Sequence, residues 1–227
     1  MRDSRTALAF GQEQMLYVAE LLHRVNNDYT SAILLASLLA SKSSSQEVKS
    51  ALGRVIGHLT DLTRVHRVLS PPAAEGSSDL GDYLCRLCEA KQVQLEWRNM
   101  MVHLVIESRV PLDNARCWRV GLVVSELITN AMRHGPASGA DRILVSLVEE
   151  AGQIVCRVTD NGGGAETFRL GLGTHLVDAL ANELKGRIER RFGESGTAIT
   201  LSFPLDLDLP RSLRGVTQSH RLSLKKA

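Results

Sequence analysis

Apolar residues near the start of the chain recur at alternating steps of three and four, the spacing of helices with a continuous apolar seam. The first run consists of Met15, Val18, Leu22, Val25, Tyr29, Ala32, Ala36 and Leu39. The second run consists of Val48, Leu52, Val55, Leu59, Leu62 and Leu69. His66 stands where this second repeat calls for an apolar residue. A polar break at 41–45 separates the runs, and Ser44 with Glu47 can form a capping box. We therefore expect two helices that fold back into a hairpin.

Further apolar positions lie outside these two seams, and a single hairpin would leave them in water. They are Ile33, Leu34, Leu38, Ile56, Val65 and Val68. A second copy of the chain would cover them, so we predict a homodimer whose two hairpins form a four-helix bundle. The stretch 70–78 is rich in Pro, Ala, Gly and Ser, and it should end the second helix because proline cannot continue one. We expect the hairpin at 1–72 and a linker at 73–78.

After the linker the pattern changes to mixed helix and strand. Asp79 is a good N-cap for a helix to about Lys91, and Pro111 with Asp113 should open a helix that ends at Gly135. Strands are expected at 102–107, 142–149, 153–159, 187–192 and 198–203, with a helix at 174–184. This order predicts an α+β domain at 79–208, with helices on one face of a mixed, mostly antiparallel sheet. A basic tail, 209–227, would follow.

Composition and charge narrow the class of protein. The chain has 227 residues, of which 44% are hydrophobic and 23% charged, as in ordinary soluble domains. A net charge of +2 gives no reason to expect a nucleic-acid partner. The tail from Arg211 onward holds Lys and Arg but no acid, and we expect a solvated end, with docking to a partner or contact with acidic surfaces as the alternatives. No apolar run approaches the roughly 20 residues of a membrane span. Without a leader pattern either, the expected location is cytoplasmic.

The four cysteines are expected to have a packing role more than a metal-binding or redox role. Cys85 and Cys88 form one Cys-x-x-Cys pair, while Cys117 and Cys156 stand apart. A zinc site would need a second pair or a histidine at ligand spacing, and neither is present. We expect the thiols to fill small spaces in a core.

Three motifs in a fixed order suggest a nucleotide site. They are Glu126-Leu-Ile-Thr-Asn130, Asp160-Asn-Gly-Gly-Gly164 and Gly171-Leu-Gly173-Thr174. Asp160 ends a predicted strand, where its carboxylate can accept from an adenine amino group. Asn130 and Glu126 lie one turn apart on a helix and offer the oxygen ligands that Mg²⁺ prefers, Glu126 through a bound water.

The glycines of the second and third motifs, Gly162, Gly164, Gly171 and Gly173, leave backbone that phosphates can approach. The helix expected to start near Thr174 would point its free N–H groups and its positive end at them. ATP with Mg²⁺ is therefore the predicted ligand.

These motifs resemble those of the GHKL superfamily of ATP-binding domains. Glu126 to Asn130 resembles its N box, Asp160 to Gly164 its G1 box, and Gly171 to Gly173 its G2 box. The later Gly196-Thr197 resembles the Gly-Thr pair whose hydroxyl assists adenine binding. The resemblance implies adenine binding by Asp160, Mg²⁺ binding by Asn130 and a phosphate loop lined by the glycines. Few residues separate Gly164 from Gly171, which implies a short lid.

An acceptor for phosphate is also present on the first helix. His23 lies beside the seam residue Leu22, so it should be reachable, and a neutral imidazole is a nucleophile. Arg24 can neutralise a phosphate bound there. Residues 22–27 resemble the His-Arg-Val-Lys-Asn box of the HisKA_2 and HWE class of bacterial histidine kinases, although Asn26 replaces the Lys. The absence of a Trp-x-Glu sequence at 159–161 favours the HisKA_2 side. Because Arg24 occupies the place of an acidic base, Glu126 is our candidate general base.

The sequence thus predicts an ATP-dependent protein-histidine kinase that autophosphorylates His23 and passes the phosphoryl group to a response-regulator aspartate. About twenty residues precede His23, so we expect the input to come from a separate sensor protein or from a longer native chain. One alternative is a phosphotransferase relay protein whose ATP-like domain no longer binds nucleotide. A serine kinase of the anti-sigma type and a binding-only dimer scaffold also remain open.

Overall fold

The computed structural model describes residues 3–72, 76–163 and 172–205. The chain divides into two compact units, Met1–Ala73 and Ala74–Ala227. Gly164, Gly171, the short lid between them and the basic tail at 209–227 lie outside the described residues. Among the helices within these ranges, none combines the length and apolarity that crossing a membrane requires.

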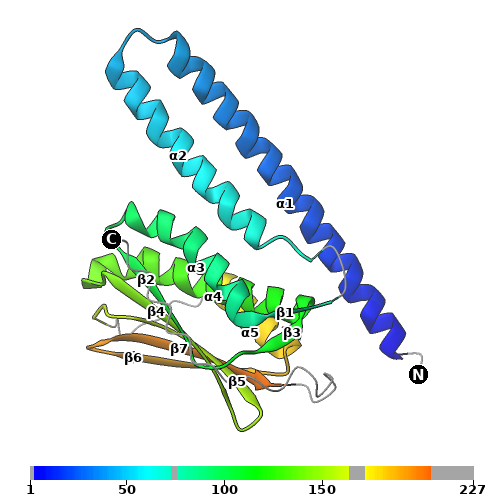
Figure 1. Cartoon of the computed structure of the whole chain (residues 1–227). Helices are drawn as coiled ribbons and strands as arrows, with labels where there is room; N and C mark the ends of the chain where they lie inside the picture. The colour runs from blue at the N-terminus through cyan, green and yellow to red at the C-terminus, as the bar shows by residue number, and fades with distance from the viewer. Residues whose placement is uncertain (1–2, 73–75, 164–171, 206–227) are drawn as a thin grey trace. The chain divides into compact units, whose positions relative to one another are not determined.

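The first unit is the predicted helical hairpin (Figure 1). Helix α1 (Asp3–Lys42) packs along α2 (Gln46–Val68). The cap of α2 is Ser45, whose hydroxyl accepts the Val48 N–H at 3.4 Å. The capping box expected at Ser44 is therefore wrong by one residue, because the chain stays non-helical for one position longer.

The seam between the two helices follows the predicted pattern only in part. Leu22, Val25 and Tyr29 are half-buried, and the Tyr29 ring lies 5.4 Å from the His66 ring, which explains a histidine at a seam position. Towards the turn, however, Ala32, Leu39, Val48 and Val55, which the pattern assigns to the seam, are exposed. A strict seven-residue repeat drifts around a straight helix of 3.6 residues per turn, so a single apolar stripe cannot face the neighbour along its whole length.

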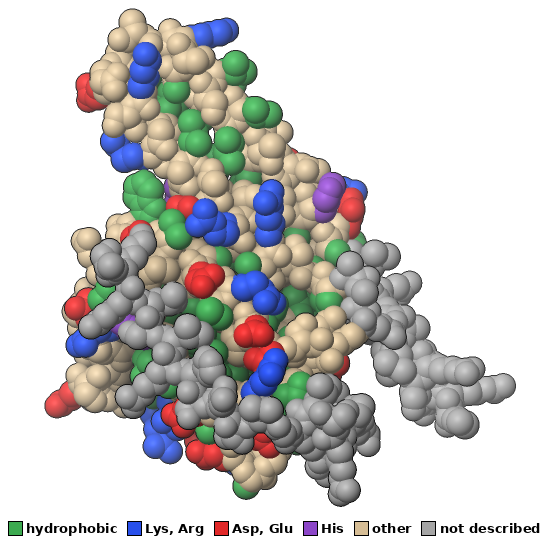
Figure 2. Space-filling model, in the orientation of Figure 1, with side chains coloured by type: hydrophobic (Ala, Val, Ile, Leu, Met, Phe, Trp, Pro, Cys, Tyr) green, Lys and Arg blue, Asp and Glu red, His purple; other side chains and the backbone are tan. Residues whose placement is uncertain are grey.

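Apolar side chains remain exposed on the hairpin, as expected. Leu34 is 61% exposed and Leu38 is 57% exposed. Ile33, Ile56 and Val68 are half-buried, whereas Val65 is buried, contrary to the expectation that a single hairpin leaves it in water. Figure 2 shows hydrophobic side chains at the surface of this unit. Tyr17 and Leu21 are exposed as well. We call six exposed residues of the hairpin the apolar face: Leu34, Leu35, Leu38, Leu39, Val48 and Val55.

The second unit is a layer of helices on one face of a five-stranded sheet (Figure 1). The strand order is β2 (Met101–Ile106), β4 (Arg142–Glu150), β5 (Gln153–Asp160), β7 (Gly196–Pro204), β6 (Arg187–Gly193). Strands β2 and β4 are parallel, and the other pairs are antiparallel. The helices are α3 (Leu80–Glu96), α4 (Asn114–His134) and α5 (Leu172–Glu183). The predicted α+β class is confirmed.

The core lies between the helices and the sheet. Alternate strand residues such as Ile143, Leu147 and Phe203 are fully buried, as are Leu84 and Ile128 from the helices. The cysteines serve packing, as predicted: Cys88, Cys117 and Cys156 are buried and Cys85 is half-buried, all as free thiols. Burial raises the pKa of Cys117 and Cys156 to about 12. The described residues include no group of His, Cys, Asp and Glu that could hold a metal ion by itself.

Two short strands were not predicted. Strand β1 (Ser77–Asp79) pairs antiparallel with β3 (Pro111–Asp113), so part of the expected linker and the expected helix start at Pro111 are extended. The cap at Asp79 is as predicted, since its side chain accepts the Asp82 N–H at 3.1 Å. The helix expected to open at Pro111 with Asp113 is capped by Asp113, which accepts the Arg116 N–H at 2.8 Å. A three-residue strand is too short to show alternation, so only its distant partner reveals it.

Helix α4 ends at Gly135, as predicted, but for a different physical reason. Gly135 keeps right-handed backbone angles and leads into a 3-10 turn, η1 (Pro136–Ser138). A Cβ at Gly135 would lie 2.5 Å from the Ala131 carbonyl oxygen and 2.8 Å from the Ala140 Cβ. Glycine is needed here for close packing.

Candidate active site

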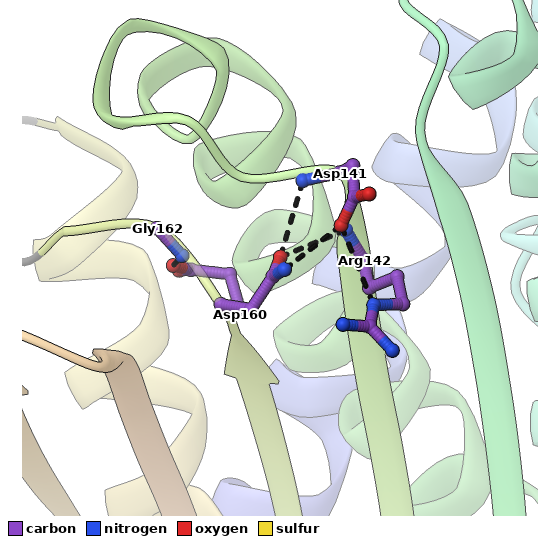
Figure 3. Close-up of polar contacts among 5 residues, drawn as sticks. Asp141, Arg142, Asp160 and Gly162 are labelled. Atoms are coloured by element: carbon purple, nitrogen blue, oxygen red, sulfur yellow. Dashed lines mark hydrogen bonds and ion pairs between the residues drawn. The ribbon is translucent and has the colours of Figure 1, made fainter.

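Asp160 stands at the end of β5 and is held by the backbone around it. Its Oδ1 accepts the N–H of Gly162 at 3.0 Å (Figure 3). The same oxygen accepts the N–H of Thr197 at 3.4 Å. A Cβ at Gly162 would overlap the Ser138 hydroxyl, and one at Gly196, where φ is +131°, would overlap the Asp160 carbonyl oxygen. Glycine is required at Gly196 because the close contact is with backbone, whereas the Ser138 hydroxyl beside Gly162 can rotate. The N–H groups of Gly162 and Thr197 fix the Asp160 carboxylate at the end of β5.

The neighbouring Asn161 joins two strand ends. Its Oδ1 accepts the N–H groups of Asp141 at 3.1 Å and Arg142 at 2.9 Å, and its Nδ2 donates to Asp141 Oδ1 at 2.8 Å (Figure 3). The hydrogen bond from Asn161 lowers the pKa of the Asp141 carboxyl. Sequence reasoning gave Asn161 no role, although an amide can both donate and accept. Its contacts hold the end of β5 against the start of β4, next to Asp160.

Glu126 and Asn130 lie one turn apart on α4, and both are half-buried. The Glu126 side chain packs against Gly173 in the first turn of α5, where a Cβ would overlap the Glu126 carboxylate. Thr174 follows and is buried. Helix α5 begins at Leu172, slightly earlier than predicted, so Gly173 and Thr174 belong to the turn whose N–H groups lack helical acceptors. A carboxylate and a helix N-terminus therefore meet here, and the Asn130 amide lies one turn further along α4.

This donor set fits a magnesium ion that accompanies a phosphate ligand. Both Glu126 and Asn130 supply oxygen atoms, and both stay partly accessible to solvent. Magnesium keeps several waters and takes other ligands from the phosphates, so two protein oxygens suffice for such a site.

Lys91 was not anticipated from the sequence. It lies on α3 with 5% of its surface exposed, and its Nζ donates to the Thr129 hydroxyl at 2.8 Å. Thr129 in turn donates to the Ser125 carbonyl at 2.7 Å. Burial lowers the pKa of Lys91 to about 8, while the negative charge of Glu126 acts in the opposite direction. No sequence signal marks this lysine, because its neighbours in the structure come from another helix.

His23 belongs to the other unit and is exposed on α1, as predicted. The Asn27 amide Nδ2 lies 3.4 Å from His23 Nδ1. Arg24 is exposed as well, and its Nε contacts Glu20 Oε1 at 2.8 Å. The hydrogen bond from Arg24 holds the pKa of Glu20 below its usual value. Such an exposed pair is weak, so Arg24 is available to another anion.

The predicted site residues that the structure describes fall into three groups, with Asn130 one turn from Glu126 on α4. Asp160, Gly162 and Thr197 are in contact through hydrogen bonds, and Glu126 touches Gly173 beside Thr174 on the helix that follows. His23 and Arg24 lie in the first unit.

Comparison with known proteins agrees with this geometry. The family model of the histidine kinase-like ATPase domain matches residues 88–203. Blue-light-activated histidine kinase 1 of Erythrobacter litoralis is 26% identical over 204 residues, which cover 86% of this chain and 54% of the relative. Blue-light-activated histidine kinase 2 of the same organism is 26% identical over 199 residues, covering 83% of this chain and 57% of the relative. The chain spans about half the length of these curated relatives.

Solved structures show the same fold. The histidine kinase domain of the Erythrobacter litoralis EL346 blue-light activated histidine kinase aligns with a TM-score of 0.56 and 20% identity, covering 78% of this chain and 96% of that one. The Acinetobacter baumannii histidine kinase AdeS aligns with a TM-score of 0.51 and 20% identity, covering 81% and 96%. The family model spans the sheet from β2 to β7 and the motifs built on it. The chain therefore belongs to the histidine kinase-like ATPase domain family.

Proposed function

We propose that the chain is the core of an ATP-dependent protein-histidine kinase, which phosphorylates His23 and passes the phosphoryl group to a response-regulator aspartate. One observation carries this proposal: a chain with a histidine kinase-like ATPase domain also presents an exposed histidine on a two-helix hairpin. The matches to the two curated relatives support it, because an alignment over 86% of the chain extends beyond the second unit into the hairpin.

Asp160 is our candidate for reading adenine. Two backbone N–H groups hold its Oδ1, so the carboxylate has a fixed direction, and Oδ2 is the atom we assign to the adenine amino group. The Thr197 hydroxyl lies on the adjacent strand and would assist. A fixed acceptor at the rim of a sheet selects a base with an amino group at this position.

The triphosphate would lie towards the first turn of α5. Gly173 and Thr174 supply N–H groups and the positive end of the helix, and Asn130 with Glu126 would hold Mg²⁺. When bound, Mg²⁺ would offset phosphate charge. Gly164 and Gly171 remain predicted phosphate-loop residues from the sequence.

The transfer itself needs positioning more than covalent help. A ring nitrogen of His23 would form a bond to the γ-phosphorus, and the bond from that phosphorus to the β,γ-bridging oxygen would break, with its electron pair leaving on ADP. The ring proton then passes to a base, for which Glu126 is our candidate. Asn27 beside Nδ1 would orient the ring, and Arg24 would offset the charge of the phosphohistidine.

We further propose that the chain acts as a homodimer through the apolar face of the hairpin. Exposed leucines in a row are costly in water, and a second hairpin presents the matching surface. Signal input from a separate sensor protein and a cytoplasmic location stay predictions from the sequence.

Incubation with γ-labelled ATP and Mg²⁺ tests the kinase proposal. The parent should acquire an acid-labile, alkali-stable label, while His23→Ala and Asn130→Ala should lose it entirely. His58→Ala is the matched control, because it removes an exposed histidine from the other helix of the hairpin and should keep the label. Label that persists in His23→Ala would refute the assignment of the acceptor.

The relay alternative makes the opposite prediction for nucleotide. If the domain no longer binds ATP, calorimetry with Mg²⁺ present would show no affinity, and Asp160→Asn would change nothing. We expect micromolar-range binding by the parent and roughly a 10- to 100-fold loss in Asp160→Asn, since a hydrogen bond to a charged group contributes about 1.5–3 kcal/mol.

A further inference from the structure

We infer that Lys91 is a positioning residue of the nucleotide site: anchored by Thr129, its ammonium group is the buried counter-charge that lets the Glu126 carboxylate stand beside the triphosphate. The inference rests on the proposed binding of ATP at this site. It concerns how a domain with an acidic side chain at the phosphate end tolerates a highly negative ligand.

The burial of Lys91 calls for an explanation. Only 5% of its surface is exposed, and lysine is seldom buried without a partner because its charge must leave water. Its neighbours along the inner face of α3 are apolar residues such as Leu87, Cys88 and Leu95, which are fully buried. An apolar side chain of similar length would satisfy packing at this position, so the charge itself is the feature that needs a role.

The groups around Lys91 all come from one stripe of α4. Nζ donates to the Thr129 hydroxyl at 2.8 Å, and that hydroxyl is itself fixed by the Ser125 carbonyl at 2.7 Å. Glu126 attracts the ammonium group, and Arg133, one turn beyond Thr129, repels it. Positions 126, 129 and 133 share a helix face, so the lysine faces the same stripe that carries Glu126.

Glu126 connects Lys91 to the nucleotide site. The carboxylate packs against Gly173 in the first turn of α5, where the phosphates are proposed to bind. A lone carboxylate there would repel phosphate and oppose the attraction of the helix N-terminus. The positive charge of Lys91 offsets it, so Glu126 is kept for its role in transfer without a loss of ATP affinity.

The test is a charge-compensation cycle read by calorimetry, which does not depend on phosphorylation. Lys91→Met should weaken the binding of ATP, measured without Mg²⁺, about tenfold, because the negative charge of Glu126 is no longer offset, and should change adenosine affinity less than twofold. Glu126→Gln in the same chain should restore this metal-free ATP affinity to within threefold of the parent, since the negative charge beside the phosphates is gone and the proposed Mg²⁺ role of Glu126 does not enter the measurement. Thr129→Val, which keeps the lysine and removes its anchor, should weaken ATP binding two- to fivefold.

Other outcomes would overturn the inference. Unchanged ATP affinity in Lys91→Met shows that the charge plays no part, and equal losses for ATP and adenosine show a structural role only. A double variant that binds ATP more weakly than Lys91→Met shows that Lys91 does not act through Glu126. Should Lys91→Met fail to fold, the Thr129→Val result decides alone. A parent that binds no ATP refutes the proposed function itself, whereas normal binding by parent and variants refutes only the role of Lys91.

Discussion

The two units of this chain are stabilised in different ways. In the hairpin, among residues whose burial is described, the only buried apolar side chains are Ala36, Val65 and Leu69. The second unit buries complete strands and helix faces, including Phe203, Ile154 and Leu80. The hairpin consists of two helices that are neighbours in sequence, and few of its described apolar side chains are buried. The second unit has a fully buried apolar core built from segments that are distant in sequence. This difference is the reason why we propose that the hairpin, and not the second unit, pairs with a second copy of the chain.

The largest effect is expected for substitutions on the apolar face of the hairpin. Leu34→Asp combined with Leu38→Asp places two charges on one stripe of the apolar face, where a second hairpin would have to desolvate them. We expect the dimer dissociation constant to rise by roughly 100-fold or more, measured by sedimentation equilibrium, with ATP binding by the second unit unchanged.

A matched control adds the same charge elsewhere on the hairpin. Ser44→Asp with Gln46→Asp alters exposed polar positions at the turn and should leave the dimer intact. A parent that is monomeric at high micromolar concentration, or a double aspartate variant that still dimerises, would contradict the assignment of the apolar face.

Substitutions in the buried core of the second unit should have the opposite effect, a loss of stability with no change in dimerisation. Phe203 is fully buried on β7, and the Arg116 guanidinium lies 5.2 Å from its ring centre. Phe203→Ala should lower the free energy of unfolding of the second unit by about 3–5 kcal/mol. Leu144→Ala, at a position 41% exposed, is the control and should cost under about 1 kcal/mol. Urea unfolding followed by tryptophan fluorescence measures both, and similar losses would show that β7 is not central to the core.

A smaller effect is expected from the charge of Lys91, which is buried in the second unit. Burial lowers the pKa of Lys91 from 10.5 to about 8. Between these values the unfolded chain binds more protons than the folded one, so the free energy of unfolding should rise with pH from about 8 towards 10.5. Below pH 8 both states carry the proton and this contribution is flat.

The effect is best read as a difference between the parent and Lys91→Met. Burial raises the pKa of Cys117 and Cys156, which makes stability fall as pH rises above 9, but this effect is common to both proteins and cancels. The parent should gain up to about 2 kcal/mol on the variant between pH 8 and pH 10. Urea unfolding at intervals of one pH unit measures the difference, and a flat curve would mean that Lys91 stays hydrated.

Much of the fold was predictable because its signals are local. The break between the helices of the hairpin, the cap at Asp79 and the positions of the five longer strands along the chain all follow from patterns within a few residues. The exposed setting of His23 followed from its place beside a seam residue. The predicted helix ending at Gly135 and the predicted strand at 153–159 placed Glu126, Asn130 and Asp160 on the elements where they are found, although their roles remain proposals.

The remaining features depend on contacts between distant segments. The pairing of β1 with β3 joins residues that carry no strand pattern. Asn161 gains its function only because β4 begins beside the end of β5, and Lys91 only because α3 packs on α4. In each of these cases the partners lie far apart in sequence, so no local pattern encodes the contact.

The sequence by itself determined the longer helices and strands, the fold class and the residue types offered to a nucleotide, because periodicity, caps and glycine clusters act over one or two turns or one strand. Only the tertiary structure decided which backbone N–H groups fix Asp160, which glycines are required by close approach, and which lysine stands near Glu126. Hydrogen bonds and buried charges depend on distance in space. The distances between these groups are set only when the sheet and the helices pack together, and local sequence patterns do not specify that packing.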